Sequence, residues 1–400
     1  MRNSIASDIA VVGGGPVGLC AALALGHDGR NISIIEASQL RVPNEEGLNA
    51  RSIALSYSSV QIFRALGIWP AIKKRSVPIG HIHVSSRGRW GITRLHASDY
   101  DIPALGYVIE SQHLVAGLLR AVEASGNISL ICEASFEAID NNQKVEIEFK
   151  HQKRTRRISS DLALIADGAG SLARGALGID HREVDYAQSA IITNVEFSHA
   201  LPDHAYERFT EQGPLAILPL GGKRYACVWT RDNQAVEVLM QLDDVDFAAE
   251  LQECFGIRLG YVERIGRRFS FPVRRTEAAS LGKGRCLLIG NAANALHPVA
   301  GQGFNLALRD IAGLYELMQN RVDLSDLVDA YQRHRQPEQR RVVRLGDGLV
   351  NLFSNQLPLL DHARAGGLAM LDLMPMLKTQ VAMSGMGFGF GGNALLRGRL

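Results

Sequence analysis

Residues 284–310 carry the groups in this sequence that are best suited to chemistry. A short apolar run, Cys286–Ile289, has the length of a strand and ends at Gly290 and Asn291. After a loop containing His297 and Pro298, Gly301-Gln302-Gly303 opens a segment with helical spacing of apolar residues. A helix N-terminus presents unpaired N–H groups and about half a positive charge. This loop therefore suits a planar acceptor that becomes anionic, such as a reduced flavin, although an ordinary strand–loop–helix connection is the alternative.

A second glycine-rich loop lies near the N-terminus. The apolar run Asp8–Val12 leads into Gly13-Gly-Gly-Pro-Val-Gly18 and continues as a predicted helix, Leu19–Leu25. The next predicted strand, Ile32–Glu36, ends in an acid. Strand, G-x-G-x-x-G loop, helix and terminal acid together form the βαβ fingerprint of a dinucleotide-binding fold.

Each residue type in that fingerprint has a physical task. Gly13 allows a tight turn, Gly15 lets a pyrophosphate approach the backbone, and Gly18 lets helix and strand pack closely. Glu36 can accept hydrogen bonds from ribose hydroxyls, which argues against a 2′-phosphate at that position. The fingerprint alone does not separate FAD from NAD.

Further polar residues follow predicted strands. Arg51 lies in a small-residue setting and either contacts cofactor phosphate or flavin or is an ordinary solvated arginine. Tyr107–Val122 is predicted as an amphipathic helix with Ser111 as its N-cap and Gln112 in its first turn. The buried run that starts at Asp161 ends at Asp167-Gly168, so a polar elbow follows this strand as it does at Gly290-Asn291.

The other segments indicate an α/β fold with an inserted sheet. A helix is predicted at 58–66, strands at 76–100, and antiparallel strands at 128–160. Residues 183–275 lack strand–helix alternation, and Gly221-Gly222 is predicted as a hairpin turn between two of their strands. We therefore predict a Rossmann-like domain formed by 1–75, 101–182 and 276–345, a β-sheet substrate domain formed by 76–100 and 183–275, and a C-terminal helical segment at 346–400.

The C-terminal quarter is the least specific part of the sequence. Leu327–Leu345 is predicted as a helix interrupted near Pro337. Five of the eight methionines lie between Met370 and Met386, which gives this end of the chain a deformable apolar surface. The segment is either a helical cap on the core or a contact for an apolar ligand or a bilayer surface.

Composition excludes several classes of protein. With 46% hydrophobic and 21% charged residues, the composition is typical of a soluble globular protein. A net charge of +2 does not indicate binding to nucleic acid. Five scattered cysteines without metal-ligand spacing indicate reduced thiols, a cytoplasmic location and no metal. Arg2 followed by the apolar Ile9–Leu25 superficially resembles a signal peptide, but glycines and a proline interrupt that run.

The three motifs together resemble the flavoprotein aromatic hydroxylases with the para-hydroxybenzoate hydroxylase fold. Within that family, Arg51-Ser-Ile-Ala-Leu, Gln112, Gly213–Pro219 and Ala300-Gly-Gln-Gly-Phe-Asn-Leu are similar to the ubiquinone-biosynthesis hydroxylases. Most family members have Asp where this chain has Asn291. The resulting Gly-Asn-Ala-Ala loop is most similar to the branch of 2-polyprenyl-6-methoxyphenol hydroxylases.

The resemblance implies a chemistry and a site. FAD, reduced by a transiently bound NAD(P)H, would react with O2 to give a C4a-hydroperoxide that hydroxylates a polyprenylated phenol. The partners implied are that phenol, other ubiquinone-pathway proteins and a peripheral membrane surface. The catalytic residues implied are His297, Pro298, Gly301, Gln302 and Gly303. The cofactor-binding residues implied are Gly13, Gly15, Pro16, Val17, Gly18, Glu36, Ala37, Arg51, Gln112, Asp167, Gly290, Asn291, Gly301, Gly303, Phe304 and Asn305.

Other functions keep the same motifs. A polyprenyl reductase or a hydroxylase of a soluble phenol would retain the FAD site. A reductase with two Rossmann domains is less favoured, because no second G-x-G-x-x-G follows a strand. A non-catalytic FAD-bound subunit of a lipid-pathway complex is the remaining alternative. No residue in the sequence is identified as the base that deprotonates a phenol.

Overall fold

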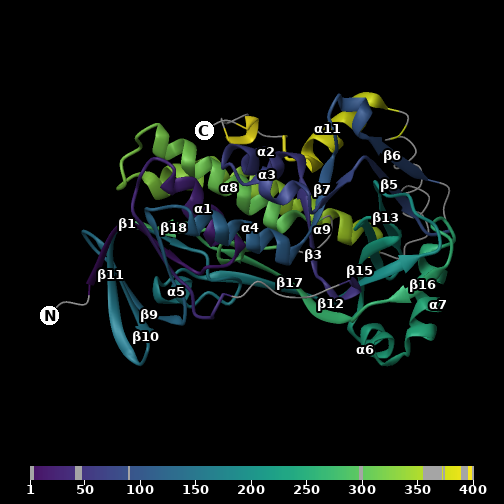
Figure 1. The fold of residues 1–400 in the computed structure, drawn as a ribbon, viewed down its shortest axis with the longest axis horizontal. Helices are drawn as coiled ribbons and strands as arrows, with labels where there is room; N and C mark the ends of the chain where they lie inside the picture. The colour runs from purple at the N-terminus through teal and green to yellow at the C-terminus, as the bar shows by residue number, and fades with distance from the viewer. Residues whose placement is uncertain are drawn as a thin grey trace.

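Two large sheets lie side by side along the longest axis of the protein (Figure 1). The computed structural model describes residues 4–40, 47–88, 91–296, 301–354, 372, 374–388 and 395–398. The long strands β12 (His181–Phe197) and β17 (Phe269–Ala278) run from one half of the molecule toward the other (Figure 1).

The eight-stranded sheet contains the predicted Rossmann-like core. Its main path is β18 (Gly282–Lys283), β19 (Cys286–Leu288), β11 (Arg154–Ile165), β1 (Ser4–Val12), β2 (Ile32–Ile35) and β8 (Ile128–Ile131). The contacts of β1 with β11 and β2, of β2 with β8 and of β11 with β19 are parallel. The last four residues of β1 and all of β2 are buried, as expected for parallel strands covered on both faces.

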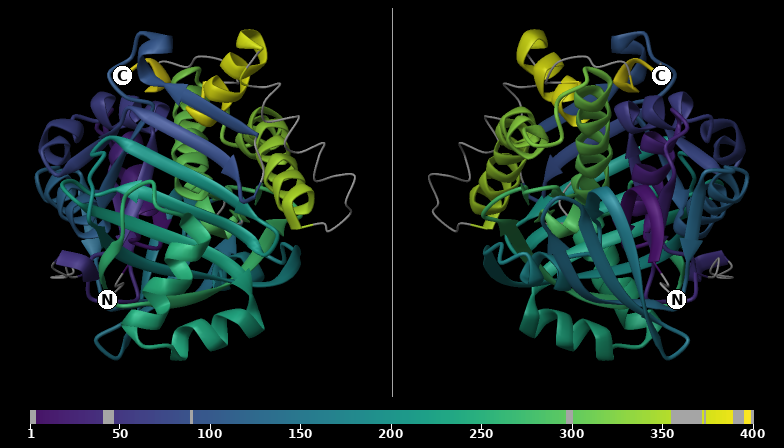
Figure 2. Two further views of the ribbon diagram at one scale, coloured as in Figure 1. Left: turned by 90° about the vertical axis from the view of Figure 1, so that its right-hand side faces the viewer. Right: turned by 90° about the vertical axis from the view of Figure 1, so that its left-hand side faces the viewer.

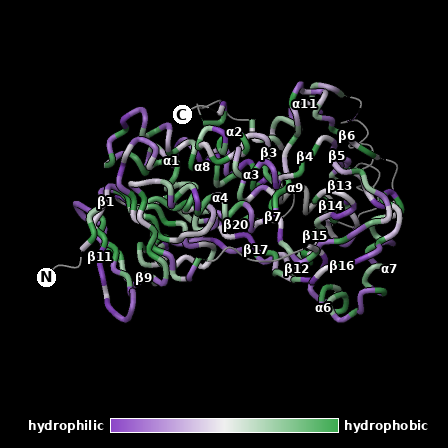
Figure 3. Tube along the Cα trace, in the orientation of Figure 1, coloured by the Kyte–Doolittle hydropathy of each residue, from purple (hydrophilic) through white to green (hydrophobic). Residues whose placement is uncertain are grey.

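Three helices cover one face of this sheet, and a hairpin extends it from β11. The helices α1 (Pro16–Gly26), α4 (Ser111–Glu123) and α8 (Gln302–Gln319) pack together on one face, with α1 in the middle. The hairpin of β9 (Ala134–Asn141) and β10 (Val145–His151) continues antiparallel from β11 and contacts α5 (Leu172–Ala176). Figure 3 shows hydrophobic residues along the inner strands and hydrophilic residues at outlying turns.

The nine-stranded sheet is the predicted inserted element. Its order is β20 (Asn294–Ala295), β17, β12, β15 (Arg224–Asp232), β14 (Gly213–Pro219), β13 (His204–Thr210), β5 (His81–Ser86) and β6 (Ile92–His96), with β16 (Val262–Ile265) paired to β12. All its pairs are antiparallel except that of β13 with β5. The helices α6 (Asn233–Gln241) and α7 (Asp244–Phe255) cover one face over a separate core. Both glycines of the predicted Gly221-Gly222 turn have positive φ.

A small three-stranded sheet lies between the two halves (Figure 1), and Figure 2 views the molecule from either end of its longest axis. It consists of β3 (Ser52–Ser56), β7 (Gly106–Glu110) and β4 (Ser76–Ile79). Along the chain, the helices α2 (Tyr57–Ala65) and α3 (Trp69–Lys73) lie between β3 and β4. Ile79 and Val108 of this sheet pack against Ala205 and Ala226 of the nine-stranded sheet. The predicted α/β fold class is thus confirmed, while the domain limits stay a prediction.

Three predicted elements are wrong in detail. Residues 107–110 belong to strand β7, and α4 begins at Ser111 with Glu110 as its N-cap. The segment 107–110 does not extend the helix because it pairs with β3 on one side and β4 on the other. Strand β8 is parallel to β2, since the whole of α4 intervenes before it. Helix α9 (Leu327–Ser354) continues through Pro337 without a break.

A buried ionic network holds α9 on α8 around Pro337. Arg309 Nε donates to Glu338 Oε1 at 2.6 Å, and Arg335 Nε donates to Asp310 Oδ1 at 2.8 Å. Gln339 donates to the second oxygen of Asp310 at 2.8 Å. Because all five side chains are at most 5% exposed, these contacts fix the residues on both sides of the proline and explain why the helix is not interrupted.

Beyond the end of α9, a helix and a turn of the C-terminal segment are described. Helix α11 (Pro375–Gly385) buries Ala382, and the adjoining Met386 also joins a small core that includes Leu95 and Leu105. The turn at Leu395–Arg397 places Leu395 and Leu396 in the main core. Within the described ranges, no helix combines the length and the apolar character needed to cross a bilayer.

Candidate cofactor and substrate site

The three predicted motifs meet at one edge of the eight-stranded sheet. Because β1, β11 and β19 are neighbouring parallel strands, their carboxyl ends lie side by side. Backbone hydrogen bonds continue past the strands, from Ala166 N to Val12 O at 2.7 Å and from Ile289 N to Ile165 O at 2.9 Å. Ligands of open α/β sheets bind at this kind of edge.

The fingerprint glycines are required for two different reasons. Gly13 has φ +105°, and a Cβ there would lie 2.5 Å from Ala166 O, while a Cβ at Gly18 would lie 1.9 Å from Gly13 O. These two positions are closed by protein backbone. A Cβ at Gly15 would have no neighbour within 4 Å, so its missing side chain leaves room at the N-terminus of α1.

The acid of the fingerprint has protein partners. Glu36 Oε2 accepts from Gly14 N at 2.7 Å, and Glu36 Oε1 accepts from Ser38 N at 2.9 Å. These bonds fasten the end of β2 to the glycine loop, with Ala37 exposed beside it. The expected bond from Glu36 to a ribose hydroxyl stays a prediction.

Asp167 offers an unpaired acceptor to the same edge. Its Oδ2 accepts from Ala173 N at 3.2 Å, but its Oδ1 is buried and has no hydrogen-bond partner among the described residues. The following Gly168 has φ +91°, which glycine adopts without strain. A buried carboxylate oxygen without a donor is costly, so the site suits a ligand that brings hydroxyl groups.

Gly290 fits tightly against the fingerprint helix. It has φ +60°, and a Cβ there would lie 3.0 Å from Cγ1 of Val17, which follows Pro16 at the start of α1. Asn291 comes next in a short 3-10 turn with an exposed side chain. His297 and Pro298 lie outside the described residues, so their predicted catalytic roles stay predictions.

The N-terminus of α8 is fixed by Asn305. Gly301 caps the helix in the left-handed region, and no side chain caps the amides that follow. Asn305 Nδ2 donates to Gly301 O at 2.8 Å and to Ala54 O at 3.0 Å. Its Oδ1 accepts from Ser56 N at 2.9 Å and from Ser59 Oγ at 2.7 Å. Since these four bonds use the full capacity of the amide, any contact of position 305 with a cofactor would come from its backbone.

Three predicted cofactor-binding residues remain: Phe304 in α8, Arg51 before β3 and Gln112 in α4. Phe304 packs against the main core, with its ring centroid 6.4 Å from that of Phe63. Arg51 and Gln112 come together at the junction of β3 and α4, where Ser111 N donates to Arg51 O at 2.7 Å. Gln112 Nε2 donates to Glu110 Oε2 at 3.0 Å.

A carboxyl group that the sequence did not single out lies on the inner face of the nine-stranded sheet. Glu207 pairs with Ala216, whose neighbours Leu215 and Ile217 point into the core under α6 and α7. Directly opposed residues share a face, so Glu207 points to the other side of the sheet. Burial raises the pKa of Glu207 from 4.5 to about 7.

The surroundings of Glu207 are apolar and incompletely covered. Its row across the sheet contains Val84, Ala216 and Val228, all half-buried, whereas Leu215 and Ile217 on the opposite face are fully buried. This is the face that packs on the three-stranded sheet at Val108. No motif or spacing in the sequence predicts Glu207 as a site residue, because its burial depends on which face of the strand points inward.

A basic groove of about 680 Å³ opens elsewhere on the surface. It is lined by the turn Gly47–Asn49, by Met240 and Asp244, and by the run Arg264–Arg268. Arg267 N donates to Asn49 Oδ1 at 2.9 Å, and the Arg267 guanidinium lies 5.0 Å from the centroid of the Phe269 ring. Arg264 faces Glu196 and Arg268 faces Asp244, at 3.4 Å each, so the Arg267 guanidinium is the group in this groove best placed to meet a ligand phosphate.

The residues at the sheet edge fit FAD. The uncapped amides of α1 and the space at Gly15 suit a pyrophosphate. The unpaired oxygen of Asp167 and the exposed amide of Asn291 suit sugar-like hydroxyls, and the uncapped start of α8 suits an electron-rich ring edge.

Comparisons with known proteins agree with this geometry. A family model described as an FAD binding domain matches residues 6–345. The chain is similar to the ubiquinone hydroxylase UbiL of Rhodospirillum rubrum, with 31% identity over 95% of this chain and 90% of the relative. It is also similar to the 3-demethoxyubiquinol 3-hydroxylase of Escherichia coli, with 30% identity over 95% of this chain and 98% of the relative.

The fold has solved counterparts. The crystal structure of p-nitrophenol 4-monooxygenase PnpA from Pseudomonas putida superimposes with a TM-score of 0.79 at 18% identity, covering 98% of this chain and all of that chain. At this identity the similarity establishes a shared fold, in which a parallel sheet and an antiparallel sheet are joined as predicted.

Proposed function

This chain belongs to the family of FAD-dependent monooxygenases built on the FAD binding domain, and we propose that it hydroxylates the aromatic ring of a polyprenylated phenol in ubiquinone biosynthesis. FAD is the cofactor, and NAD(P)H is the electron donor typical of this class. The observation that carries the proposal is the near full-length similarity to two ubiquinone hydroxylases. Within that class we favour 2-polyprenyl-6-methoxyphenol as substrate, because of the Gly-Asn-Ala-Ala loop at Asn291.

The protein's own contribution begins with placing FAD, which activates O2 when it is bound and reduced. Gly15 and the α1 amides would hold the pyrophosphate, and Asp167 and Asn291 would hold sugar-like hydroxyls of the cofactor. The α8 N-terminus stabilises negative charge on the ring edge. Asn305 keeps these amides in place by tying α8 to β3.

Glu207 is the group we assign to the phenol. Its row of half-buried aliphatic side chains accommodates an apolar ring, and its carboxylate Oε accepts the proton of the phenolic hydroxyl. Electron density then rises in the ring, which favours attack on an electrophilic oxygen. A pKa of about 7 leaves a substantial fraction of the carboxylate able to act as a base near neutral pH.

The basic groove at Arg264–Arg268 is the place we assign to NAD(P)H. Arginine guanidinium groups bind phosphate oxygens, and the groove borders the turn at Gly47–Asn49 that leads into β3 and Arg51. A transient electron donor needs an open surface site instead of a second Rossmann domain. Arg267→Glu should therefore raise the KM for NAD(P)H while leaving FAD content unchanged.

The exposed apolar side chains on and next to α11 would supply the membrane contact expected for a polyprenyl substrate. Met376 is 80% exposed, Val381 49% and Leu377 40%, and Met374 and Met383 are also exposed. Large side chains exposed together on one short helix are unusual at a water-facing surface. We assign this helix to reversible contact with the bilayer surface in which the substrate is dissolved.

The proposal is tested by quinone profiling of cells lacking the protein, together with turnover of the purified enzyme. Accumulation of 2-polyprenyl-6-methoxyphenol, and its O2-dependent hydroxylation in vitro, is the expected result. Accumulation of a later, demethoxylated quinol would instead identify that quinol as the substrate and another ring position as the one hydroxylated. Oxygen-independent reduction of a polyprenyl chain, turnover of soluble phenols alone, or FAD binding without any turnover would each replace the proposal with one of its alternatives.

A further inference from the structure

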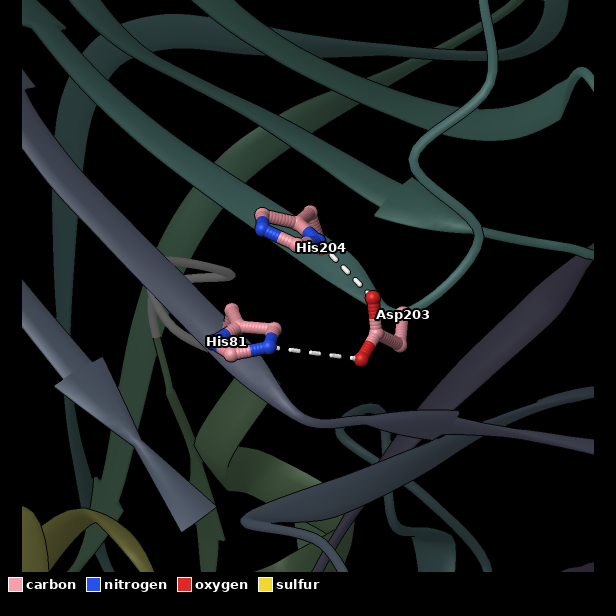
Figure 4. A group of neighbouring side chains, drawn as sticks. All are labelled: His81, Asp203 and His204. Carbon is pink, nitrogen blue, oxygen red and sulfur yellow. Dashed lines mark hydrogen bonds and ion pairs between the residues drawn. The ribbon is translucent and has the colours of Figure 1, made fainter. Parts of the chain in front are cut away.

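Three imidazoles and a carboxylate gather at the end of the nine-stranded sheet that is farthest from β20, away from the three cofactor motifs. They are His81 at the start of β5, His96 at the end of β6, and Asp203 and His204 at the start of β13. The sheet register places His204 opposite His81 and His81 opposite His96. Residues distant in sequence thus meet at one point, as Figure 4 shows for His81, Asp203 and His204.

The donor atoms of this cluster converge. His81 Nε2 lies 3.5 Å from Asp203 Oδ2, and His204 Nδ1 lies 2.8 Å from Asp203 Oδ1. The donor atoms of the three residues all lie within 4.8 Å of one another. A tetrahedral Zn2+ with Zn–N and Zn–O distances of roughly 2.0–2.2 Å separates its donors by about 3.3 Å. The observed spacing is therefore close to what one ion requires.

The backbone holds the carboxylate in place. Gly80 N and His81 N both donate to Asp203 O, at 2.9 and 3.1 Å. A Cβ at Gly80 would lie 2.6 Å from Asp203 Oδ2, so a side chain at that position would displace the carboxylate. The fold thus fixes the backbone of Asp203, and its carboxylate occupies the space left by the absent side chain of Gly80.

His96 completes the arrangement behind the ligands. Its Nδ1 lies 2.6 Å from His81 Nδ1, so one of the two nitrogens donates a proton to the other. With the proton on His81 Nδ1, the lone pair of His81 Nε2 faces a carboxylate oxygen, and a cation between these two acceptors would satisfy both. Ligating histidines in proteins use their second ring nitrogen in this way. With the opposite tautomer, His81 Nε2–H donates to Asp203 instead.

We propose that His81, Asp203 and His204 bind one divalent transition-metal ion, with His96 orienting His81 and water as the fourth ligand. Imidazole and carboxylate donors suit Zn2+ and its neighbours in the first transition row. The ion joins β13 to β5, with His96 of β6 behind it, at the edge of the sheet that carries Glu207. Its role is to fasten this edge, and it takes no part in the oxygen chemistry.

The test uses full-length, FAD-loaded protein without a histidine tag. Zn2+ binding is measured by isothermal titration calorimetry and by metal content after dialysis, and the melting temperature is followed with and without Zn2+. Wild-type protein should bind one equivalent and melt at a higher temperature with Zn2+. His81→Gln and His204→Gln should lose the binding and the shift, and His96→Gln should weaken affinity by about 10–100-fold.

His199→Gln is the matched control, because His199 is exposed, lies in the same sheet domain and is outside the cluster. This variant should bind Zn2+ like wild type. Should a ligand variant fold poorly, as judged by circular dichroism and FAD content, Asp203→Asn provides an independent test of the same site. Absence of a bound equivalent in wild type, or unchanged binding in the ligand variants, would overturn the proposal. In either case the cluster would be a hydrogen-bonded group of histidines around Asp203 without a metal ion.

Discussion

Asn305 Oδ1 accepts a hydrogen bond from Ser56 N at 2.9 Å and thereby ties the first turn of α8 to the end of β3. The two residues belong to segments far apart in sequence, and Asn305 is 2% exposed. Because the same amide also binds Gly301 O, this one side chain fixes the first residues of α8 relative to β3.

The first prediction concerns that amide. Asn305→Ala should lower the free energy of unfolding by about 2–4 kcal/mol, because several buried groups lose their partner at about 1–3 kcal/mol each. Ser59→Ala removes one of the four bonds and should cost about 0.5–1.5 kcal/mol. Urea denaturation of the FAD-free proteins compares the two. Equal losses would mean that Asn305 is not the organising contact.

The second prediction separates the two kinds of fingerprint glycine. Gly15→Val should fold normally but purify colourless, because its side chain fills open space meant for the pyrophosphate. Gly18→Val should instead fail to fold, since a Cβ there would lie 1.9 Å from Gly13 O. Circular dichroism and FAD absorbance distinguish these outcomes. Stoichiometric FAD in folded Gly15→Val would disprove the assignment of this loop.

The third prediction concerns Asn291. Asn291→Asp should bind FAD with equal or modestly changed affinity, since an acceptor oxygen of the same shape remains. Asn291→Leu should weaken FAD binding by about tenfold or more, because a buried hydroxyl without a partner costs roughly 1–3 kcal/mol. Dissociation constants come from fluorescence quenching. Wild-type affinity for FAD in the leucine variant would contradict the assignment of residues 284–310 to flavin binding.

The fourth prediction uses the raised pKa of Glu207. An acid with a folded-state pKa of about 7 and an ordinary value of 4.5 stabilises the fold while protonated and loses that stabilisation as pH rises from 4.5 to 7. Glu207→Gln should therefore be more stable than wild type at pH 8, on the order of 3 kcal/mol, and similar to it near pH 4.5. Thermal melting across this pH range measures the difference.

The same variant tests the catalytic assignment. Wild-type kcat should rise with pH toward a plateau above pH 7, as the carboxylate forms. Glu207→Gln should lose this rise and lower kcat by about 10²–10⁴-fold, the usual contribution of a general base. A variant with altered stability but unchanged kcat and pH profile would leave Glu207 as a structural residue.

The fifth prediction concerns α11. Met376→Glu with Val381→Glu should reduce binding to lipid vesicles and turnover of long-tailed substrate, while FAD content stays the same. Ile257→Glu is the control, because Ile257 is equally apolar and 75% exposed but lies in another part of the sequence. Point changes are preferable to deletion, since Met386 and Leu395 are buried. Unchanged vesicle binding would contradict a membrane role for this helix.

The sequence by itself determined the local geometry of the glycine turns at the sheet edge. Gly13, Gly15 and Gly18 could be assigned because steric requirements of a βαβ turn are local, and the Gly221-Gly222 turn was predictable for the same reason. The elbows after Ile165 and Ile289 could be recognised from apolar runs that end abruptly. Their meeting followed from the rule that carboxyl ends of parallel strands share an edge.

The tertiary structure alone decided what depends on partners distant in sequence. Residues 107–110 pair as a strand because β3 and β4 flank them, although their own pattern fits a helix. Helix α9 passes Pro337 because a buried ionic network holds both sides of it. Sheet register and the choice of buried face also decide three other features: the burial of Glu207, the four partners of Asn305 and the cluster around Asp203. A single sequence does not encode those properties in any local pattern.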